Sequence, residues 1–404
     1  MSEVAAAAGG TVRMMGSVDT TIGLLERLVG FPTVSASSNL ELVQFVEAYL
    51  ADHGVEVSLS FDATGRKANV FATIGPRVDG GVVLCGHTDV VPVDDQRWNS
   101  EPFALMRRNG RLYGRGSADM KGFIACALAQ VPAYLATPLQ VPVHLAFTFD
   151  EEVGSCGAPI LVEQIRELPY RPRIAIVGEP TSMRLISGHK GGYEMITTVT
   201  GLEGHASDPR RGVNAISYAT RFIERLDRIA ADLAAHPDAT TPFDPAYTTI
   251  SVGTIHGGTA RNVIPGTCSF DWEIRPVGRD DCREILAAMD AYVRDELLPE
   301  MRARSPSADV ATHLFAACPG LVHDPDSEAI ALVRELTGLN ATEVVPFGTD
   351  AGHLQEGGMS CVVFGPGSIE QAHKPDEFIA VDQLQACLGF LDRLREWLST
   401  PGRK

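Results

Sequence analysis

Three short apolar runs of this chain end next to a side chain that can bind a metal ion. Residues 82–84, 145–149 and 174–177 form the runs, and His87, Glu152 and Glu179 follow them. Uninterrupted apolar runs of this length predict buried strands of a sheet that is covered on both faces. Open α/β sheets bind ligands beyond the carboxyl ends of such strands. The pattern therefore predicts an α/β fold with a polar site at one edge of its sheet.

Strand-like and helical stretches alternate over the first 190 residues. Helices are expected over about 20–29 and from Ser38 to Gly54, where Ser38 and Glu41 have the spacing of a capping box and Gly54 ends the helix. Two more helices are expected over 123–135 and 160–168. This order predicts a mixed, mostly parallel sheet flanked by helices.

The pattern changes after residue 190. Strands are expected over 193–200, 247–255 and 268–274, with helices over 214–229 and 280–298. This β-α-β-β-α order predicts a small two-layer α+β domain of the ferredoxin-like type. A helix over 327–336, a strand over 361–364 and a helix over 381–398 then resume the first pattern. We therefore expect a discontinuous metal-binding domain, 1–190 and 305–404, with an inserted domain, 191–304.

Composition and charge limit the classes of partner. A chain of 404 residues with 45% apolar and 21% charged residues is ordinary for a globular enzyme. The formal net charge of -17 argues against nucleic acid and anionic membranes, because both need basic patches. No run approaches the roughly 18 apolar residues that span a bilayer. The eight cysteines lie singly and are expected to be reduced and mostly buried. The Ala-rich start is too short and weakly apolar for a signal peptide and is expected to be disordered. We expect a cytoplasmic protein with a small-molecule partner.

Asp119 and His373 complete a set of metal ligands. Asp119 lies in a Gly-rich segment before an apolar helix, and His373 lies in a late loop. Zinc-type sites take His nitrogen and carboxylate oxygen, and a pair of ions needs a ligand that bridges them. A carboxylate bridges readily and an imidazole does not, so Asp119 is the expected bridge. His87 and Glu179 would complete one metal site, and Glu152 and His373 the other.

Two acidic residues beside these ligands have chemistry of their own. Asp89 follows His87 by two residues and is expected to accept the second imidazole N–H. Glu151 precedes Glu152 and is expected to take a proton from water at the metals. Taken singly, these residues fit a turn histidine, a solvated glutamate pair or a turn. Two carboxylates ending an apolar strand are nevertheless unfavourable without a cation. The set favours a two-metal hydrolase.

Four sequence blocks resemble those of the M20 metallopeptidase family, a group of two-zinc hydrolases, and the resemblance covers nearly the whole chain. They are 86–92, 112–122, Asp-Glu-Glu at 150–152 and Gly-Glu-Pro-Thr-Ser at 178–182. The resemblance implies that Asp119 bridges two divalent ions, often with a cis peptide after it, and that Glu151 is the general base. Zn²⁺ is the expected metal, with Co²⁺ as a substitute.

Within this family the chain most resembles the acetylornithine deacetylase branch, through segments 204–215, 365–369 and 371–377. The resemblance implies hydrolysis of N2-acetyl-L-ornithine to L-ornithine and acetate, in arginine biosynthesis. Segment 348–352 instead resembles other branches. A succinyl-diaminopimelate desuccinylase, another N-acyl-amino-acid deacylase, or a dipeptidase or carboxypeptidase of the family therefore stays an alternative. A non-catalytic metal-binding protein is a further one, against which the intact Glu151 argues.

The resemblance also implies roles for the inserted domain as a lid and as the contact of a homodimer. His205 would lie on a loop that reaches the partner subunit's active site and stabilise the oxyanion there. Arg275 would bind the substrate α-carboxylate, a task that suits a bidentate guanidinium. Asn262 would be a second substrate contact. From the residues alone, a surface histidine, a salt-bridge arginine and a turn asparagine are the alternatives.

Overall fold

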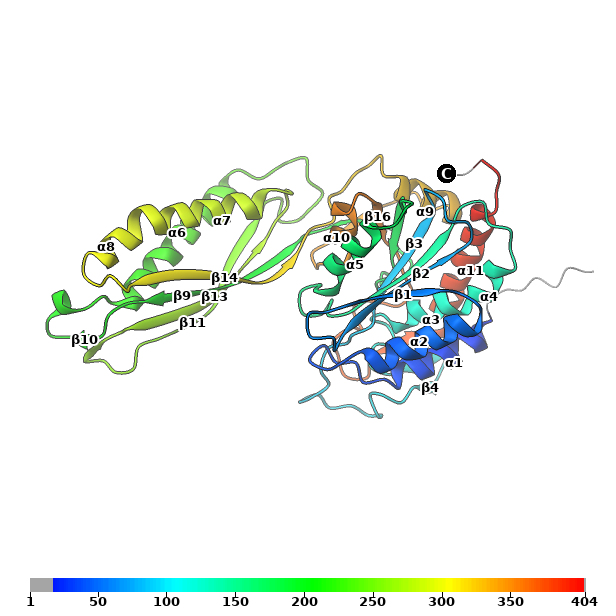
Figure 1. The fold of residues 1–404 in the computed structure, drawn as a ribbon, viewed down its shortest axis with the longest axis horizontal. Coiled ribbons are helices and arrows are strands. Elements are labelled where there is room, and N and C mark those ends of the chain that lie inside the picture. The colour runs from blue at the N-terminus through cyan, green and yellow to red at the C-terminus, as the bar shows by residue number, and fades with distance from the viewer. Residues whose placement is uncertain (1–16, 403–404) are drawn as a thin grey trace, which may run out of the picture.

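The computed structural model describes residues 17–402, which form two lobes along one long axis (Figure 1). An eight-stranded sheet forms the larger lobe and a four-stranded sheet the smaller one. Within 17–402, no helix combines the length and the apolar character needed to cross a membrane. The Ala-rich start, for which disorder was predicted, lies outside the described residues.

The large sheet has the strand order β1-β2-β6-β3-β7-β16-β8-β15. Its strands are β1 (Val57–Phe61), β2 (Ala68–Ile74), β3 (Val82–His87), β6 (Val143–Thr148), β7 (Ile174–Val177), β8 (Ile186–His189), β15 (Glu343–Val345) and β16 (Ser360–Val363). The central strands β6, β3, β7 and β16 pair in parallel, as does β8 with β15. The pairs β1–β2, β2–β6 and β16–β8 are antiparallel. The predicted mixed, mostly parallel sheet is confirmed.

Helices cover both faces of this sheet, which is why its central strands are apolar throughout. Val82 and Leu84 of β3 pack into one core with the first group of helices, and Val83 and Cys85 pack into another core with the second. The first group is α1 (Val18–Val29), α2 (Leu40–Asp52), α3 (Lys121–Ala129), α4 (Val131–Leu135), α9 (Glu328–Thr337) and α11 (Val381–Leu398). The second group is α5 (Gly157–Arg166) and α10 (Ala351–Glu356).

Two helix predictions differ from the structure in their details. The capping box at Ser38 is wrong, because Asn39 is the N-cap of α2 and makes no side-chain cap bond. Its amide instead pairs with the backbone of Ala68 on β2, at 2.9 and 3.0 Å. The single helix expected over 123–135 is divided into α3 and α4, with Pro132 in the first turn of α4. Proline has no N–H to continue a helical hydrogen-bond ladder.

The small lobe has the strand order β11-β13-β9-β14, and each neighbouring pair is antiparallel. Its elements are β9 (Gly192–Thr200), α6 (Ala215–Ala235), β11 (Thr249–Gly257), β13 (Thr267–Arg275), α7 (Asp281–Tyr292), α8 (Leu298–Arg302) and β14 (Asp309–Cys318). Figure 1 shows the helices on one side of the sheet. This β-α-β-β-α-β order is that of a ferredoxin-like layer.

Strand β14 was not predicted from the sequence, because most of its residues are exposed and it lacks a clear apolar alternation. It pairs with β9 along its whole length. The predicted inserted domain ends at residue 304, so this strand lies beyond that boundary while belonging to the small sheet. The division of the chain into two domains stays a prediction.

Two smaller sheets matter for the site. β10 (Gly204–His205) pairs with β12 (Val263–Ile264). β4 (Met106–Arg108), β5 (Arg111–Tyr113) and β17 (Phe378–Ala380) form a three-stranded sheet. This second sheet joins the chain before α3 to the chain that follows His373.

Candidate metal centre

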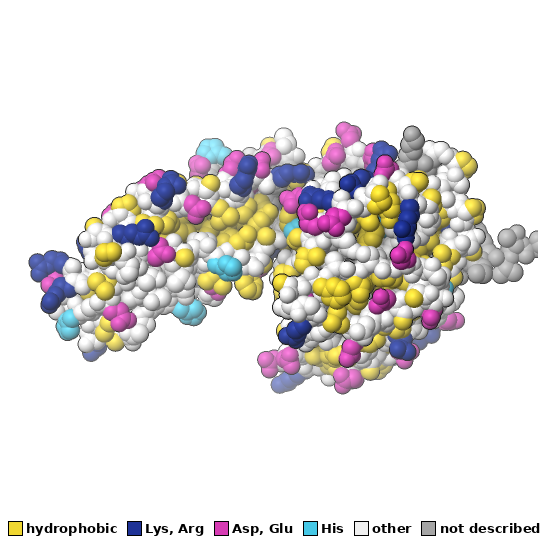
Figure 2. All heavy atoms as spheres, in the orientation of Figure 1, with side chains coloured by type: hydrophobic (Ala, Val, Ile, Leu, Met, Phe, Trp, Pro, Cys, Tyr) yellow, Lys and Arg dark blue, Asp and Glu magenta, His cyan; other side chains and the backbone are white. Residues whose placement is uncertain are grey.

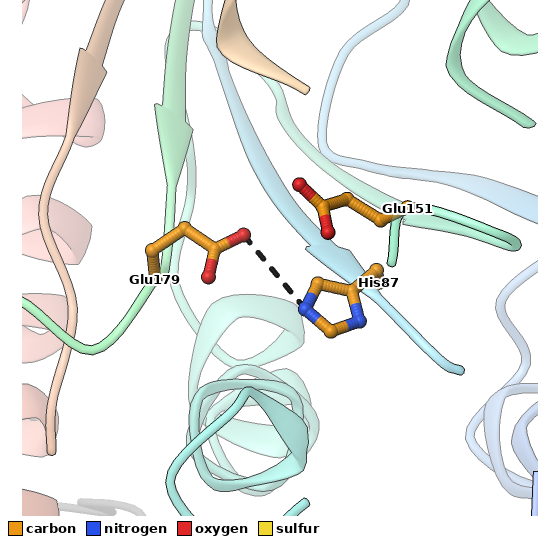
Figure 3. A group of neighbouring side chains, drawn as sticks. All are labelled: His87, Glu151 and Glu179. Atoms are coloured by element: carbon orange, nitrogen blue, oxygen red, sulfur yellow. Dashed lines mark ion pairs between the residues drawn. The ribbon is translucent and has the colours of Figure 1, made fainter. Parts of the chain in front are cut away.

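Ligand-type side chains gather beyond the carboxyl end of the large sheet. His87 is the last residue of β3, and the parallel neighbours β6 and β7 lead to Glu151, Glu152 and Glu179. Figure 3 shows the side chains of His87, Glu151 and Glu179 pointing toward one another. The parallel register therefore brings residues far apart in the sequence into one site, as the strand-end pattern predicts.

Asp119 lies between the two histidines. Its Oδ1 is 3.1 Å from His87 Nε2, and its Oδ2 is 3.5 Å from His373 Nε2. His87 Nε2 is also 3.8 Å from Glu179 Oε1, and His373 Nε2 is 2.9 Å from Glu152 Oε2. Two ligands held about 2.1 Å from one tetrahedral ion lie about 3.4 Å apart. The two oxygens of Asp119 thus face opposite halves of the centre, the arrangement that a bridging carboxylate requires.

Glu151 is part of the same centre. Ligand-type atoms of His87, Glu151 and Glu179 lie within 4.8 Å of one another, and so do those of His87, Asp119 and Glu152. Both groups share His87. Glu151 therefore lies on the His87 side, within the range from which a carboxylate can act on a reactant held there.

The burial of these carboxylates fits a divalent cation. Asp119 is 6% exposed and Glu179 is 5% exposed. Oε1 of Glu179 is buried without a hydrogen-bond partner among the described residues. Burial raises the pKa of Glu151, Glu152 and Glu179, and neighbouring carboxylates add to the effect. Buried acidic groups this close together call for positive charge, so these residues fit a divalent metal.

The pKa values of Asp119 and His373 shift in opposite directions. Burial opposes ionisation of Asp119, but hydrogen bonds from His373 and His87 outweigh it and lower the pKa of Asp119. Hydrogen bonds to Asp119 and Glu152 raise the pKa of His373 to about 10. Both shifts reflect the pairing of anionic and imidazole groups at one point, which is the environment of a ligand cluster.

The imidazole of His87 is oriented by Asp89, through the backbone carbonyl of that residue. Nδ1 of His87 lies 2.9 Å from the backbone carbonyl of Asp89 and 3.6 Å from its carboxylate. Donation to the carbonyl leaves Nε2 free to face Asp119. The Asp89 carboxylate instead accepts the backbone N–H groups of Glu151 and Glu152, at 3.1 and 3.3 Å, and the Ser35 hydroxyl at 2.7 Å. It therefore holds the loop that follows β6.

The backbone around Asp119 needs its glycines. Gly116 has φ +80, a left-handed conformation that side chains rarely adopt. A Cβ on Gly122 would lie 2.5 Å from the carbonyl oxygen of Ser117. The peptide bond between Asp119 and Met120 is cis, as the family resemblance implies.

Two of the residues predicted in the inserted domain, His205 and Asn262, lie apart from this centre within one chain. His205 on β10 pairs with β12, and the carbonyl of Asn262 accepts the N–H of Ala206 at 3.0 Å, so His205 and Asn262 are neighbours. Figure 1 shows β10 at the outer end of the small lobe, away from the large one. Arg275 lies at the opposite end of β13 and forms an ion pair with Glu273 at 2.7 Å.

Sequence reasoning missed three buried or half-buried residues that support the centre. Lys67 Nζ forms an ion pair with Asp150, directly before Glu151. Asp350 Oδ2 accepts the Thr148 hydroxyl at the end of β6, at 2.6 Å. Glu377 binds the backbone before Asp119. Three consecutive acidic residues at 150–152 were a signal that a cation lies nearby, whereas Glu377 offered only its closeness to His373 in the sequence.

Comparisons with known proteins find similar sequences and similar folds. The family model described as peptidase family M20/M25/M40 matches residues 83–396. The acetylornithine deacetylase of Salmonella arizonae is 36% identical over 369 residues, which cover 89% of this chain and 92% of that protein. The aminopeptidase PepT of Bacillus cereus has a TM-score of 0.70 at 19% identity, with 96% and 100% of the two chains covered. A dinuclear metal-binding M20 peptidase of Bacillus subtilis has a TM-score of 0.63 at 17% identity, with 94% and 97% covered. The two structures share the fold.

Proposed function

The chain belongs to peptidase family M20/M25/M40 and is an amidohydrolase of that metal-dependent family; we propose that its substrate is N2-acetyl-L-ornithine, which it converts to L-ornithine and acetate. The match to the Salmonella arizonae protein, at 36% identity over 92% of that protein's length, carries this proposal. A net charge of -17 suits a substrate with a cationic side chain. A cytoplasmic location and a role in arginine biosynthesis belong to the same proposal.

The proposed ligands of the two ions are those of the sequence prediction. His87 and Glu179 would hold one ion, Glu152 and His373 would hold the other, and Asp119 would bridge them. The distances from each oxygen of Asp119 to a different histidine support this assignment. Zn²⁺ is the proposed metal, and Co²⁺ is expected to substitute for it. When bound, such ions polarise the amide carbonyl and acidify water.

Glu151 is the proposed proton carrier. Its backbone N–H is held by Asp89, and its side chain points at His87 and Glu179 (Figure 3). Glu151 takes the proton of the attacking water as the oxygen joins the acetyl carbon. It then gives that proton to the departing amine nitrogen when the C–N bond breaks. Acetate keeps the oxygen of the water, and ornithine leaves with a complete amino group.

The length of the small lobe supports a homodimer in which subunits share their sites. β13 has nine residues and spans roughly 27 Å between the Arg275 end and the end near His205 and Asn262. An acylated amino acid cannot contact both ends in one chain. In the proposal, Arg275 binds the substrate α-carboxylate in its own subunit, and His205 and Asn262 serve the partner's site. His205 stabilises the oxyanion there.

Apolar surface on the small lobe supports the same contact. Ile255, Leu314 and Phe315 of β11 and β14 are large apolar side chains that are 44 to 60% exposed. Figure 2 shows hydrophobic side chains gathered on the small lobe, beside its junction with the large lobe. These side chains lie on the two edge strands of the small sheet, and exposed apolar surface is characteristic of contact regions. In the proposal, the inserted domain joins the subunits and closes over the substrate as a lid.

Substrate profiling tests the proposal. Amine release is measured with N-acetyl-ornithine, N-succinyl-diaminopimelate, other N-acyl amino acids and dipeptides, each with Zn²⁺, with Co²⁺ and with a chelator. A chelator-sensitive preference for N-acetyl-ornithine is expected. A preference for another amide would reject the substrate and keep the metal centre. No turnover by protein that holds its metals would reject the enzymatic proposal.

A further inference from the structure

A buried glutamate binds the backbone that leads to Asp119. The side chain of Glu377 is fully buried in its ion pair with Arg115. Its Oε1 accepts the backbone N–H groups of Ala118 and Asp119, at 2.9 and 3.1 Å. Its Oε2 accepts the backbone N–H of Gly116 at 3.0 Å and Nη1 of Arg115 at 2.8 Å. Both carboxylate oxygens are therefore occupied by donors from one short segment.

These contacts fix the main chain immediately before the proposed bridging ligand. The N–H of Asp119 is itself one of the donors, and its Cα is the next atom along the chain. Gly116 supplies the left-handed turn that lets three backbone N–H groups converge on one carboxylate. The position of the Asp119 side chain thus depends on an acceptor that comes from a segment 258 residues away in the sequence.

The same network reaches the other side of the centre. Arg115 Nη2 donates to Gln96 Oε1 at 2.6 Å, and Gln96 Nε2 donates to the backbone carbonyl of His373 at 2.9 Å. His373 lies four residues before Glu377 and has φ +61. The backbone of His373 is therefore held from both directions, by the chain through Glu377 and by the amide of Gln96.

We propose that Glu377 is a positioning residue that sets the separation between Asp119 Oδ2 and His373 Nε2, and thereby the affinity for the ion on the Glu152 side. It acts through the Asp119 amide directly and through Arg115 and Gln96 on His373. Its own oxygens bind Arg115 and the backbone at 116–119, so it is not one of the proposed ligands. The inference rests on the ligand set of the proposed function and deepens it.

Glu377→Gln tests this proposal with little change in shape. A glutamine offers one acceptor oxygen and turns an NH₂ group toward donors, so it cannot satisfy the same set. Co²⁺ is titrated into the metal-free full-length protein, in the oligomeric state in which it is purified. Binding is followed by calorimetry and by the visible absorption spectrum of Co²⁺. Loss of at least about tenfold in affinity for one of two ions is expected, the usual effect of losing a partner that orients ligands. The kcat should fall while KM changes little.

Two further variants keep the test decisive. Asp392→Asn removes another buried carboxylate that is paired with an arginine, Arg395 on α11, and it should leave Co²⁺ binding unchanged. Gln96→Ala lies in a half-buried position, so it should fold, and it should weaken the same ion about threefold to tenfold.

The outcomes separate this inference from the proposed function. Wild-type affinities for both ions in Gln96→Ala and in any folded Glu377→Gln protein would overturn the positioning role. Equal weakening in Asp392→Asn would also overturn it, because the effect would then follow from general destabilisation. If the wild-type chain binds no divalent ion, the proposed metal centre itself is wrong.

Discussion

The side chains of Glu151 and Glu152 point toward different neighbours, although both residues follow the same strand, β6. The amides of both residues are held by Asp89. Glu152 pairs with His373, whereas Glu151 faces His87 and Glu179. At the scale of single residues, one carboxylate is therefore available as a ligand and its neighbour as a base.

Glu151→Gln should retain both metal ions and lose at least about a thousandfold in turnover, because the base that activates water is removed. Bound metal is measured by elemental analysis, and amine release is measured alongside. Glu163→Gln, on the exposed surface of α5, is the matched control and should keep wild-type activity. Turnover within tenfold of wild type in the Glu151 variant would remove Glu151 from the proposed mechanism.

His144 should make the fold sensitive to acid. It is fully buried on β6 beside the Thr73 hydroxyl, and burial lowers its pKa to about 4. The unfolded chain binds a proton near pH 6.5 and the folded chain only near pH 4, so stability is lost as the pH falls between these values. The contribution reaches up to about 3 kcal/mol.

Urea unfolding of the wild type and of His144→Phe, both at pH 7 and pH 5, measures this effect. The wild type should lose more unfolding free energy than the variant between the two pH values. Equal losses in the two proteins would show that His144 does not titrate in this way.

At the scale of single elements, β7 and α3 of the large lobe pack closely together beside the metal centre. The end of β7 passes against α3, where a Cβ on Gly178 would lie 2.0 Å from the ring of Phe123. Gly178 directly precedes Glu179. The close approach of the backbone to α3 therefore also positions Glu179, a proposed metal ligand. Helix α3 begins directly after Met120, and the element contact therefore links two sides of the centre.

Gly178→Ala should destabilise the protein by about 1 to 3 kcal/mol or more, because the added methyl has no space. Gly23→Ala on α1 is the matched control. Nothing lies within 4 Å of its Cβ position, so it should stabilise the helix by roughly 0.5 to 1 kcal/mol. Urea unfolding of both variants checks the pair, and equal effects would contradict the proposed contact.

At the scale of the whole molecule, the outer end of the small lobe carries His205 and Asn262 far from the metal centre of the same chain (Figure 1). The two lobes are joined where β9 begins and β14 ends. A site that needs both regions must therefore be assembled from two subunits or after a large movement of the lobes.

Mixing His205→Ala subunits with Glu151→Gln subunits should restore part of the activity that each variant lacks alone. A mixed dimer would hold one site with an intact Glu151 and an intact His205 from the partner. Activity is measured after the subunits are exchanged, with formation of mixed dimers checked by differently tagged chains. If mixed dimers form but are inactive, His205 acts at the active site of its own subunit.

The sequence by itself determined the mixed sheet and predicted which ligand-type side chains gather at its edge. Short apolar runs before His87, Glu152 and Glu179 predict buried strands, and parallel neighbours bring their carboxyl ends to one edge. The fold class was predictable for the same reason, because strand and helix periodicities are local properties of the chain.

Only the tertiary structure decided which atoms serve which purpose. The carbonyl of Asp89 rather than its carboxylate orients His87, and Glu377 holds the backbone of Asp119 from 258 residues away. Strand β14 became visible only through its pairing with β9. Such choices depend on distances between segments that no local pattern encodes, because hydrogen-bond partners are selected after the chain has packed.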